Sequence, residues 1–287
     1  MNIGLVLAGG MGKGAYEIGA LKAVSEFFPL NEIKYISAAS IGALNAYAYA
    51  SGNLDYACKQ WGNISKRYEK KFIKRVLDCG CINEVICKLI SCELNCEKLY
   101  IPLLRWNDKV LEYIDIADIE KEIRKDYLEA AIAVFPICNP IEIKGTIFYD
   151  GACVDNIPII PLENHFVDVI ICIYFDQNNY IFESEEYDKK IIKITFIDDS
   201  SCLSESIWVT SGSTERMMEL GYKKTKEIMG LVFSEDIDNI NEIYSKIELL
   251  NSLQTFDKEK RLTGDIIINR MNKLAKKIIK QDVKRKE

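Results

Sequence analysis

Two short sequence segments, one around Ser40 and one around Asp150, carry residue types that could perform nucleophilic chemistry. The first segment contains Ser40. It reads AASIGALNA and lies between a predicted strand and a predicted helix. Small residues around a serine at such a turn are typical of a nucleophile elbow, G-x-S-x-G, whose strained turn exposes the hydroxyl. Gly42 fills the last glycine position, whereas Ala38 replaces the first. A serine that caps the following helix would fit the same string, so both interpretations stay open here.

A serine nucleophile needs a base that accepts its proton. The only histidine, His165, lies in LENHF, and nothing around it marks a catalytic residue. Asp150 ends a predicted strand and precedes Gly151 in YDGACVDNIPI, which indicates an exposed turn at a sheet edge. An ordinary Asp-Gly turn would have the same wording. The sequence therefore favours direct activation of Ser40 by Asp150 over a triad through His165.

A glycine-rich loop, LAGGMGKGA, follows the first predicted strand. It fails two of the four fixed positions of a Walker phosphate loop. Gly10, Gly12 and Ala15 fit a dinucleotide fingerprint, but the next strand ends in SAAS without the acid that would hold a ribose. An oxyanion hole is the third possibility, because glycines let backbone N–H groups converge on one point at a helix N-terminus.

In this order, the three strings resemble the patatin-like phospholipase family. The family pattern is a G-G-G-x-R/K-G loop, a G-x-S-x-G elbow and a D-G-G/A motif. The match extends through Asn156 and Pro158 in DGACVDNIP and through the later string RMMELGY. The resemblance covers about residues 1–50 and 130–230.

This resemblance implies a serine acyl hydrolase of lipid esters, of phospholipase A or lysophospholipase type. It implies a Ser40–Asp150 dyad without histidine, and neither cofactor nor metal. The oxyanion hole would be formed by Gly10, Met11 and Gly12, with support from Gly9, Lys13, Gly14, Gly42 and Gly151. Met11 replaces the third glycine of the family. The hole can still form if φ of Met11 is negative, and the Met11 side chain could then line the acyl pocket.

The elements that must position these residues alternate between strands and helices. Residues 2–8 and YISAAS are predicted strands, and helices are predicted over about 15–28 and in IGALNAYAYA. KGTIFYDGA, FVDVIICIYF and KKIIKITFID predict three more strands. The alternation indicates an α/β protein, a three-layer α/β/α sandwich with a mostly parallel central sheet.

We expect a catalytic domain over residues 1–235 and a helical extension with a basic tail over 236–287. Residues 55–130 are predicted to be a helical, cysteine-rich insertion. Five of the 10 cysteines cluster there, from Cys79 to Cys96, in a spacing that fits no paired zinc motif. Buried, reduced thiols are the favoured interpretation.

Composition and charge limit the classes of molecule that the protein is expected to bind. The net charge of −6 disfavours nucleic acid, and 48% hydrophobic residues can form a substantial core. The string contains no Sec-type leader and no apolar run long enough to span a bilayer, so the prediction is a cytoplasmic protein, with peripheral membrane contact left open. The oligomeric state is not predicted.

Two basic segments could contact an anionic membrane. Residues 64–77, ISKRYEKKFIKRVL, can place apolar side chains on one helical face and cations on the rest, and the C-terminal tail has a similar character. A helix that packs on the core and exposes a charged face would look the same.

Two other functions stay open beside lipid hydrolysis. One is an esterase or thioesterase for small soluble substrates. The other is a catalytically silent, lipid-binding protein that keeps the fold.

Overall fold

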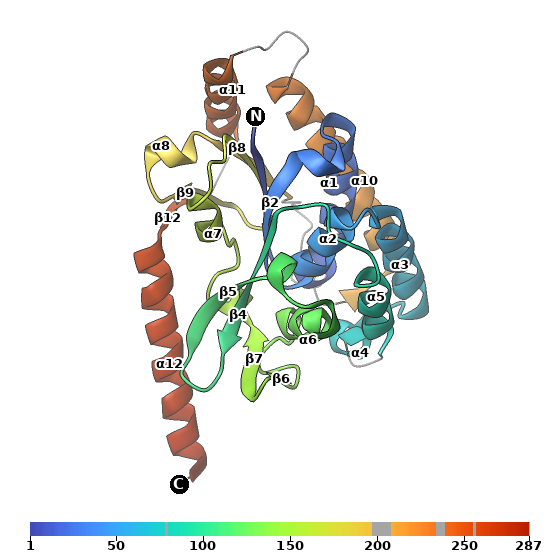
Figure 1. The fold of residues 1–287 in the computed structure, drawn as a ribbon, viewed down its shortest axis with the longest axis vertical. Coiled ribbons are helices and arrows are strands. Elements are labelled where there is room, and N and C mark those ends of the chain that lie inside the picture. The colour runs from blue at the N-terminus through green and yellow to red at the C-terminus, as the bar shows by residue number, and fades with distance from the viewer. Residues whose placement is uncertain (78–79, 197–207, 234–238, 255–256, 287) are drawn as a thin grey trace.

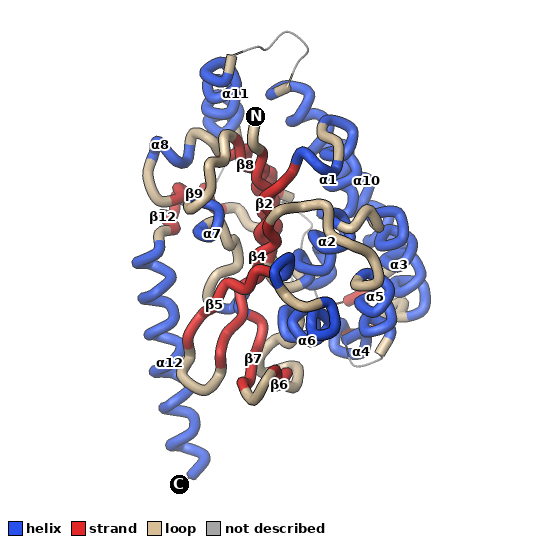
Figure 2. Tube along the Cα trace, in the orientation of Figure 1, coloured by secondary structure: helices blue, strands red, loops and turns tan. Residues whose placement is uncertain are grey.

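The fold is built on one eight-stranded sheet (Figures 1 and 2). The computed structural model describes residues 1–77, 80–196, 208–233, 239–254 and 257–286. Five neighbouring strands are parallel, in the order β10 (Ile191–Thr195), β8 (Val169–Tyr174), β1 (Ile3–Leu7), β2 (Ile33–Ala38) and β4 (Lys98–Arg105). Antiparallel strands complete the other edge: β5 (Val110–Asp115), β7 (Thr146–Asp150) and β6 (Ile141–Ile143). The prediction of a mostly parallel sheet is confirmed.

Alternation along the central strands gives the sheet two apolar faces. Ile3, Leu5 and Leu7 of β1 belong to one buried cluster, whereas Val6 and Ala8 belong to another. Successive side chains of a strand point to opposite faces. A strand that is apolar at every position must therefore be covered on both sides, which produces the three layers.

The thicker helical layer covers the face with Ile3 and Leu5. It contains α1 (Gly14–Phe27), α2 (Ile41–Ala50), α3 (Leu54–Arg67), α4 (Ile73–Leu77), α5 (Cys81–Leu89), α6 (Lys121–Ala131), α10 (Ser211–Val232) and α11 (Ile240–Leu253). At its centre α1 and α10 approach very closely. A Cβ on Gly19 would lie 1.9 Å from the carbonyl oxygen of Met218, and one on Gly221 would lie 2.1 Å from that of Tyr16.

The opposite face carries a thinner layer, seen to the left of the sheet in Figure 1. Its helices are α7 (Ile160–Glu163), α8 (Glu185–Asp188) and the long α12 (Gly264–Lys286). Ile267, Met271 and Leu274 of α12 pack on the second buried cluster. Just before α12, strand β12 (Lys258–Leu262) pairs in parallel with β9 (Asn178–Phe182). The α12 helix is thus part of the packed fold.

Residues 55–130 are only partly helical, so this prediction needs correction. Helices occupy much of 54–89 and 121–131, but β4 and β5 lie between them and belong to the main sheet. Both strands contain lysine, glutamate or proline within short apolar runs, and their strand identity comes from pairing with distant β2 and β7. The domain boundaries stay a prediction.

Residues 64–77 do not form one continuous amphipathic helix. The α3 helix ends at Arg67, Lys70 has a φ of 56°, and Lys71–Phe72 form β3, which pairs with β11 (Trp208–Val209). A second short helix, α4, then begins at Ile73. Pairing with β11 supplies backbone hydrogen bonds that the helix would otherwise have provided.

Candidate functional site

Strand register brings Ser40 and Asp150 to the same height at one end of the sheet. Ser37 of β2 lies opposite Tyr100 of β4, and Leu103 of β4 lies opposite Asp150 of β7. Ser40 follows Ser37 by three residues, as Leu103 follows Tyr100. The antiparallel direction of β7 therefore delivers its last residue to the end where the parallel strands β1 and β2 finish.

Ser40 occupies the strained turn between β2 and α2. Its φ of 53° and ψ of −129° are rare for a residue with a side chain, and strain of this kind concentrates at functional sites. Its hydroxyl makes no capping hydrogen bond to α2, so the helix-cap interpretation is wrong. A Cβ on Gly42 would lie 3.1 Å from the carbonyl oxygen of Ala8, so little space is left for a side chain there.

Asp150 is a buried carboxylate that lines the same pocket as Ser40. Only 4% of its surface is exposed. Burial raises its pKa to about 7, against the opposing effects of the Ser40 hydroxyl and of the Ala152 N–H, which donates to Oδ1 at 2.8 Å. An aspartate with this pKa can accept a proton near neutral pH and return it.

The glycine loop lies beside this pair and presents three unused N–H groups. Within the described ranges, the amides of Gly10, Met11 and Gly12 donate to no protein acceptor. The condition stated for Met11, a negative φ, is not met, since φ is 49°. Met11 thus adopts the left-handed region that a third glycine would occupy without strain. The Met11 N–H is nevertheless one of the three amides without a protein acceptor among the described residues, so the positive φ does not tie it up in the fold.

Asn156 ties the glycine loop to the segment after Asp150. Its Nδ2 donates to the Gly9 carbonyl at 3.0 Å, and the Gly9 N–H donates to the Asn156 carbonyl at 3.3 Å. A Cβ on Gly9 would lie 2.5 Å from Asn156 Oδ1 and 2.8 Å from Ser40 Cβ. Glycine is therefore needed for the close approach of the three chain segments.

The other predicted supporting residues are spread around this centre. Lys13 lines the polar pocket described below, and Gly14 begins α1 against Trp61 and Asn45. Gly151 packs on β4, where a Cβ would lie 2.5 Å from the Pro102 carbonyl.

His165 lies at the opposite end of the sheet. Its ring stacks on Tyr35, with centroids 4.4 Å apart, and its Nε2 is 3.0 Å from the Tyr100 hydroxyl. Tyr35 precedes Ser40 by five residues along β2 and the turn, a span of roughly 17 Å in extended chain. A triad through His165 is thereby excluded.

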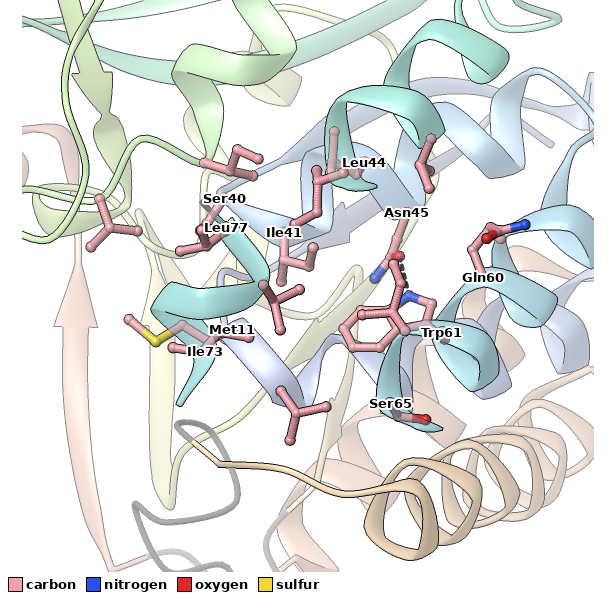
Figure 3. Close-up of a pocket in the computed structure, with 18 of the residues that line it drawn as sticks. Met11, Ser40, Ile41, Leu44, Asn45, Gln60, Trp61, Ser65, Ile73 and Leu77 are labelled. Atoms are coloured by element: carbon pink, nitrogen blue, oxygen red, sulfur yellow. Dashed lines mark hydrogen bonds between the residues drawn. The ribbon is translucent and has the colours of Figure 1, made fainter. Parts of the chain in front are cut away.

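Two pockets of different character meet at Ser40 and Met11. The first is almost entirely apolar, holds about 850 Å³ including its open side, and is lined by α2–α5 residues such as Leu44, Trp61 and Ile73 (Figure 3). The second holds about 930 Å³ by the same measure and is lined by Gly10, Lys13, Asp150, Asn156 and Asp176, among others. The arrangement suits an ester with an apolar acyl chain on one side and a polar leaving group on the other.

A buried polar network behind the apolar pocket escaped the sequence analysis. Asn45 Nδ2 donates to Glu17 Oε2 at 2.7 Å and to the Gly14 carbonyl at 3.0 Å, while Trp61 Nε1 donates to Asn45 Oδ1 at 3.1 Å (Figure 3). Burial raises the pKa of Glu17 well above its usual value. The signal in the sequence was an asparagine inside the apolar helix IGALNAYAYA.

The described residues bear on three sequence predictions, which concern metal-binding clusters, free cysteines and membrane-spanning helices. No group of three or more His, Cys, Asp or Glu side chains gathers to hold a metal ion in those ranges. Of the clustered cysteines, Cys81 is buried, Cys87 is exposed, and both are free thiols, whereas Cys79 lies outside the described residues. No described helix is both long and apolar enough to cross a membrane.

A mostly parallel sheet that presents a strained serine beside a buried aspartate provides the nucleophile and the proton acceptor that serine-dependent ester hydrolysis needs. Residues 5–79 match the family model described as Patatin-like phospholipase. This match confirms the predicted resemblance to that family, and it supports the prediction of an enzyme that hydrolyses lipid esters. No curated protein matches the chain.

Solved structures with similar folds are distant in sequence. VipD from Legionella pneumophila is 12% identical, with a TM-score of 0.46 over 88% of this chain and 74% of VipD. The type III effector ExoU is 11% identical, with a TM-score of 0.38 over 86% of this chain and 53% of ExoU. ExoU in its heterodimeric complex with SpcU from Pseudomonas aeruginosa is 14% identical, with a TM-score of 0.41 over 87% and 58%.

Proposed function

We propose that the protein is a lipid acyl hydrolase, of phospholipase A or lysophospholipase type, that works through an acyl-enzyme on Ser40. The observation that carries the proposal is the position of Ser40: it lines an apolar pocket and also a polar pocket, and it shares the polar pocket with buried Asp150, whose pKa the Ser40 hydroxyl lowers. The family match over residues 5–79 supports the lipid ester as substrate.

The chemistry needs no histidine. Asp150 accepts the proton of Ser40 Oγ as the oxygen attacks the ester carbonyl, and the N–H groups of Gly10, Met11 and Gly12 stabilise the oxyanion. Collapse of the intermediate releases the alcohol, which takes the proton from Asp150. Water then gives a proton to Asp150 and attacks the acyl group, and the proton returns to Ser40 as the fatty acid leaves.

The test is turnover of a soluble medium-chain ester and of a phospholipid, in the presence of a chelator. Ser40→Ala should abolish turnover, and Asp150→Asn should lower it by roughly 10²–10⁴-fold, the usual range for a general base. Asp155→Asn is the matched control, because Asp155 is buried, also has its pKa raised to about 7, and hydrogen-bonds Tyr113 instead of Ser40. It should keep most of the turnover if it folds.

The outcomes separate the alternatives. Activity in Ser40→Ala would contradict the mechanism. An inactive but folded wild type would favour a silent binding protein, and hydrolysis of short soluble esters alone would favour an esterase.

A further inference from the structure

An exposed aromatic pair lies on the outer side of the apolar pocket. Phe72 of β3 is 38% exposed and Trp208 of β11 is 49% exposed, and their rings meet edge to face with centroids 5.8 Å apart. The two residues face each other in the β3–β11 ladder. Their immediate neighbours, Ile73 and Val209, line the pocket.

The short helix α4 lies between this pocket and solvent, with an apolar face on the pocket and a basic face on the outside. Ile73 and Val76 are buried and line the pocket, whereas Lys74 and Arg75 are exposed. Figure 3 shows Ile73 among the residues that line the pocket. The wall of the candidate acyl pocket is therefore also a basic surface.

Among the residues that the structure describes, the charges around the aromatic pair are mostly positive. Lys70, Lys71 and Arg75 are exposed and form no ion pair with any described residue. Lys74 is different, because its Nζ donates to the Ile137 carbonyl. Two acids in the described part of this surface are already engaged.

These two acids are Glu69 and Glu215. Glu69 accepts the Ser211 N–H at 2.7 Å, and Glu215 lies 3.5 Å from Lys66. Cations thus gather around two exposed rings in a chain whose net charge is −6.

We propose that Lys70, Lys71, Phe72, Arg75 and Trp208, here called the aromatic–basic patch, dock the protein on a bilayer that contains anionic lipids. Aromatic rings favour the membrane interface, and basic side chains are attracted to anionic head groups. The net negative charge of the whole chain opposes contact through most other surfaces, so the patch would also orient the molecule.

This orientation places the pocket wall against the membrane. A lipid leaving the bilayer at the aromatic–basic patch would meet Ile73 and Val209 first, and these side chains line the pocket that reaches Ser40. This last step rests on the proposed function, whereas docking itself rests on the surface alone.

The experiment separates docking from catalysis. Co-sedimentation is measured with vesicles of phosphatidylcholine alone and with 30% phosphatidylglycerol, at about 0.1 M and about 1 M salt. The variants are Phe72→Ser/Trp208→Ser and Lys70→Ser/Lys71→Ser/Arg75→Ser. Turnover of a soluble short-chain ester and thermal unfolding are recorded for each variant.

Matched controls come from elsewhere on the surface. Phe166→Ser removes a ring that is 94% exposed beside His165, at the far end of the sheet. Lys273→Ser/Lys276→Ser/Lys277→Ser removes three exposed cations from α12.

We expect the wild type and both controls to bind anionic vesicles, and high salt to weaken binding. Each patch variant should bind anionic vesicles with an affinity that is lower by about tenfold or more. Its melting temperature and its turnover of the soluble ester should stay at the wild-type values. Undiminished binding of folded patch variants, or no vesicle binding by the wild type, would overturn the proposal. If the wild type did not hydrolyse the soluble ester, the proposed function would be contradicted. The vesicle measurements would still test docking by themselves.

Discussion

At the scale of single residues, the decisive feature is a carboxylate whose pKa folding has raised to near neutrality. Asp150 would titrate near its ordinary value if it were exposed, but burial raises its pKa to about 7. A hydroxyl and one backbone N–H offset only part of that effect. The same burial that makes Asp150 useful also makes its ionised form unfavourable for folding.

The activity should depend on pH through Asp150. Only the ionised carboxylate can accept the Ser40 proton, so kcat/KM for a soluble ester should rise from pH 5 and level off above about pH 7. Initial rates between pH 5 and 9 give the profile. A flat profile over this range would contradict the assignment of Asp150 as the base.

The stability of the wild type should depend on pH in the opposite sense, and Asp150→Asn should remove this dependence. Because the folded pKa lies above the unfolded one, the stabilising effect of the proton is complete below about pH 4 and is lost as pH rises to about 7. Above pH 7 the variant should be more stable than the wild type, by at most about 4 kcal/mol. Denaturant titrations at pH 5 and 8 measure this, and equal stability at pH 8 would contradict it.

At the scale of elements, short helices and one helix–helix contact shape the site. Helices α3, α4 and α5 build most of the apolar pocket next to Ser40. Helices α1 and α10 hold the glycine loop from behind, through contacts that only glycine permits at Gly19 and Gly221.

The size of the side chain at Ala57 should set the preferred acyl length. Ala57 lies on α3, is buried and lines the apolar pocket. Ala57→Leu and Ala57→Phe should lower kcat/KM for long-chain esters progressively, by about tenfold or more for Phe, and leave short-chain esters much less affected. Rates for a series of acyl lengths test this. An equal loss at every length, with folding intact, would argue against acyl binding in this pocket.

The α1–α10 contact should tolerate no side chain. In Gly221→Ala the new Cβ would meet the Tyr16 carbonyl, so we expect a loss of several kcal/mol in unfolding free energy. Gly230→Ala on the same helix has open space around it and should be neutral or stabilising by up to about 1 kcal/mol. Similar chemical-denaturation curves for the two variants would show that α1 and α10 can move apart without a loss of unfolding free energy.

At the scale of the whole molecule, the C-terminal helix closes the third layer. Ile267, Met271 and Leu274 of α12 cover apolar side chains on the face of the sheet opposite α1. The sequence suggested a basic extension, and the structure shows that one face of this extension contributes to the core.

Two adjacent isoleucines can test this role of α12. Ile267 is 4% exposed and Ile268 is 55% exposed. Ile267→Ala should lower the unfolding free energy by about 2–4 kcal/mol, whereas Ile268→Ala should change it by less than about 0.5 kcal/mol. Equal effects would mean that α12 does not pack on the sheet.

The sequence by itself determined the local elements around the site. Apolar strands bounded by glycine, a serine among small residues and an Asp-Gly pair specify turns through backbone sterics within a few residues. They were therefore sufficient to predict β1, β2 and β7 and to place Ser40 and Asp150 at the ends of two of these strands. The alternation of strands and helices also predicted the parallel sheet.

Only the tertiary structure decided what depends on distant pairing and burial. The strands β4 and β5 lie where helices were expected, because β2 and β7 pair with β4 and β4 in turn pairs with β5. The break in residues 64–77 depends on β11, more than 130 positions away in the chain. The positive φ of Met11, the raised pKa of Asp150 and the distance of His165 from Ser40 likewise follow from neighbours that the local sequence does not contain. Backbone sterics act over a few residues, whereas desolvation and strand pairing depend on which remote segments the fold brings together.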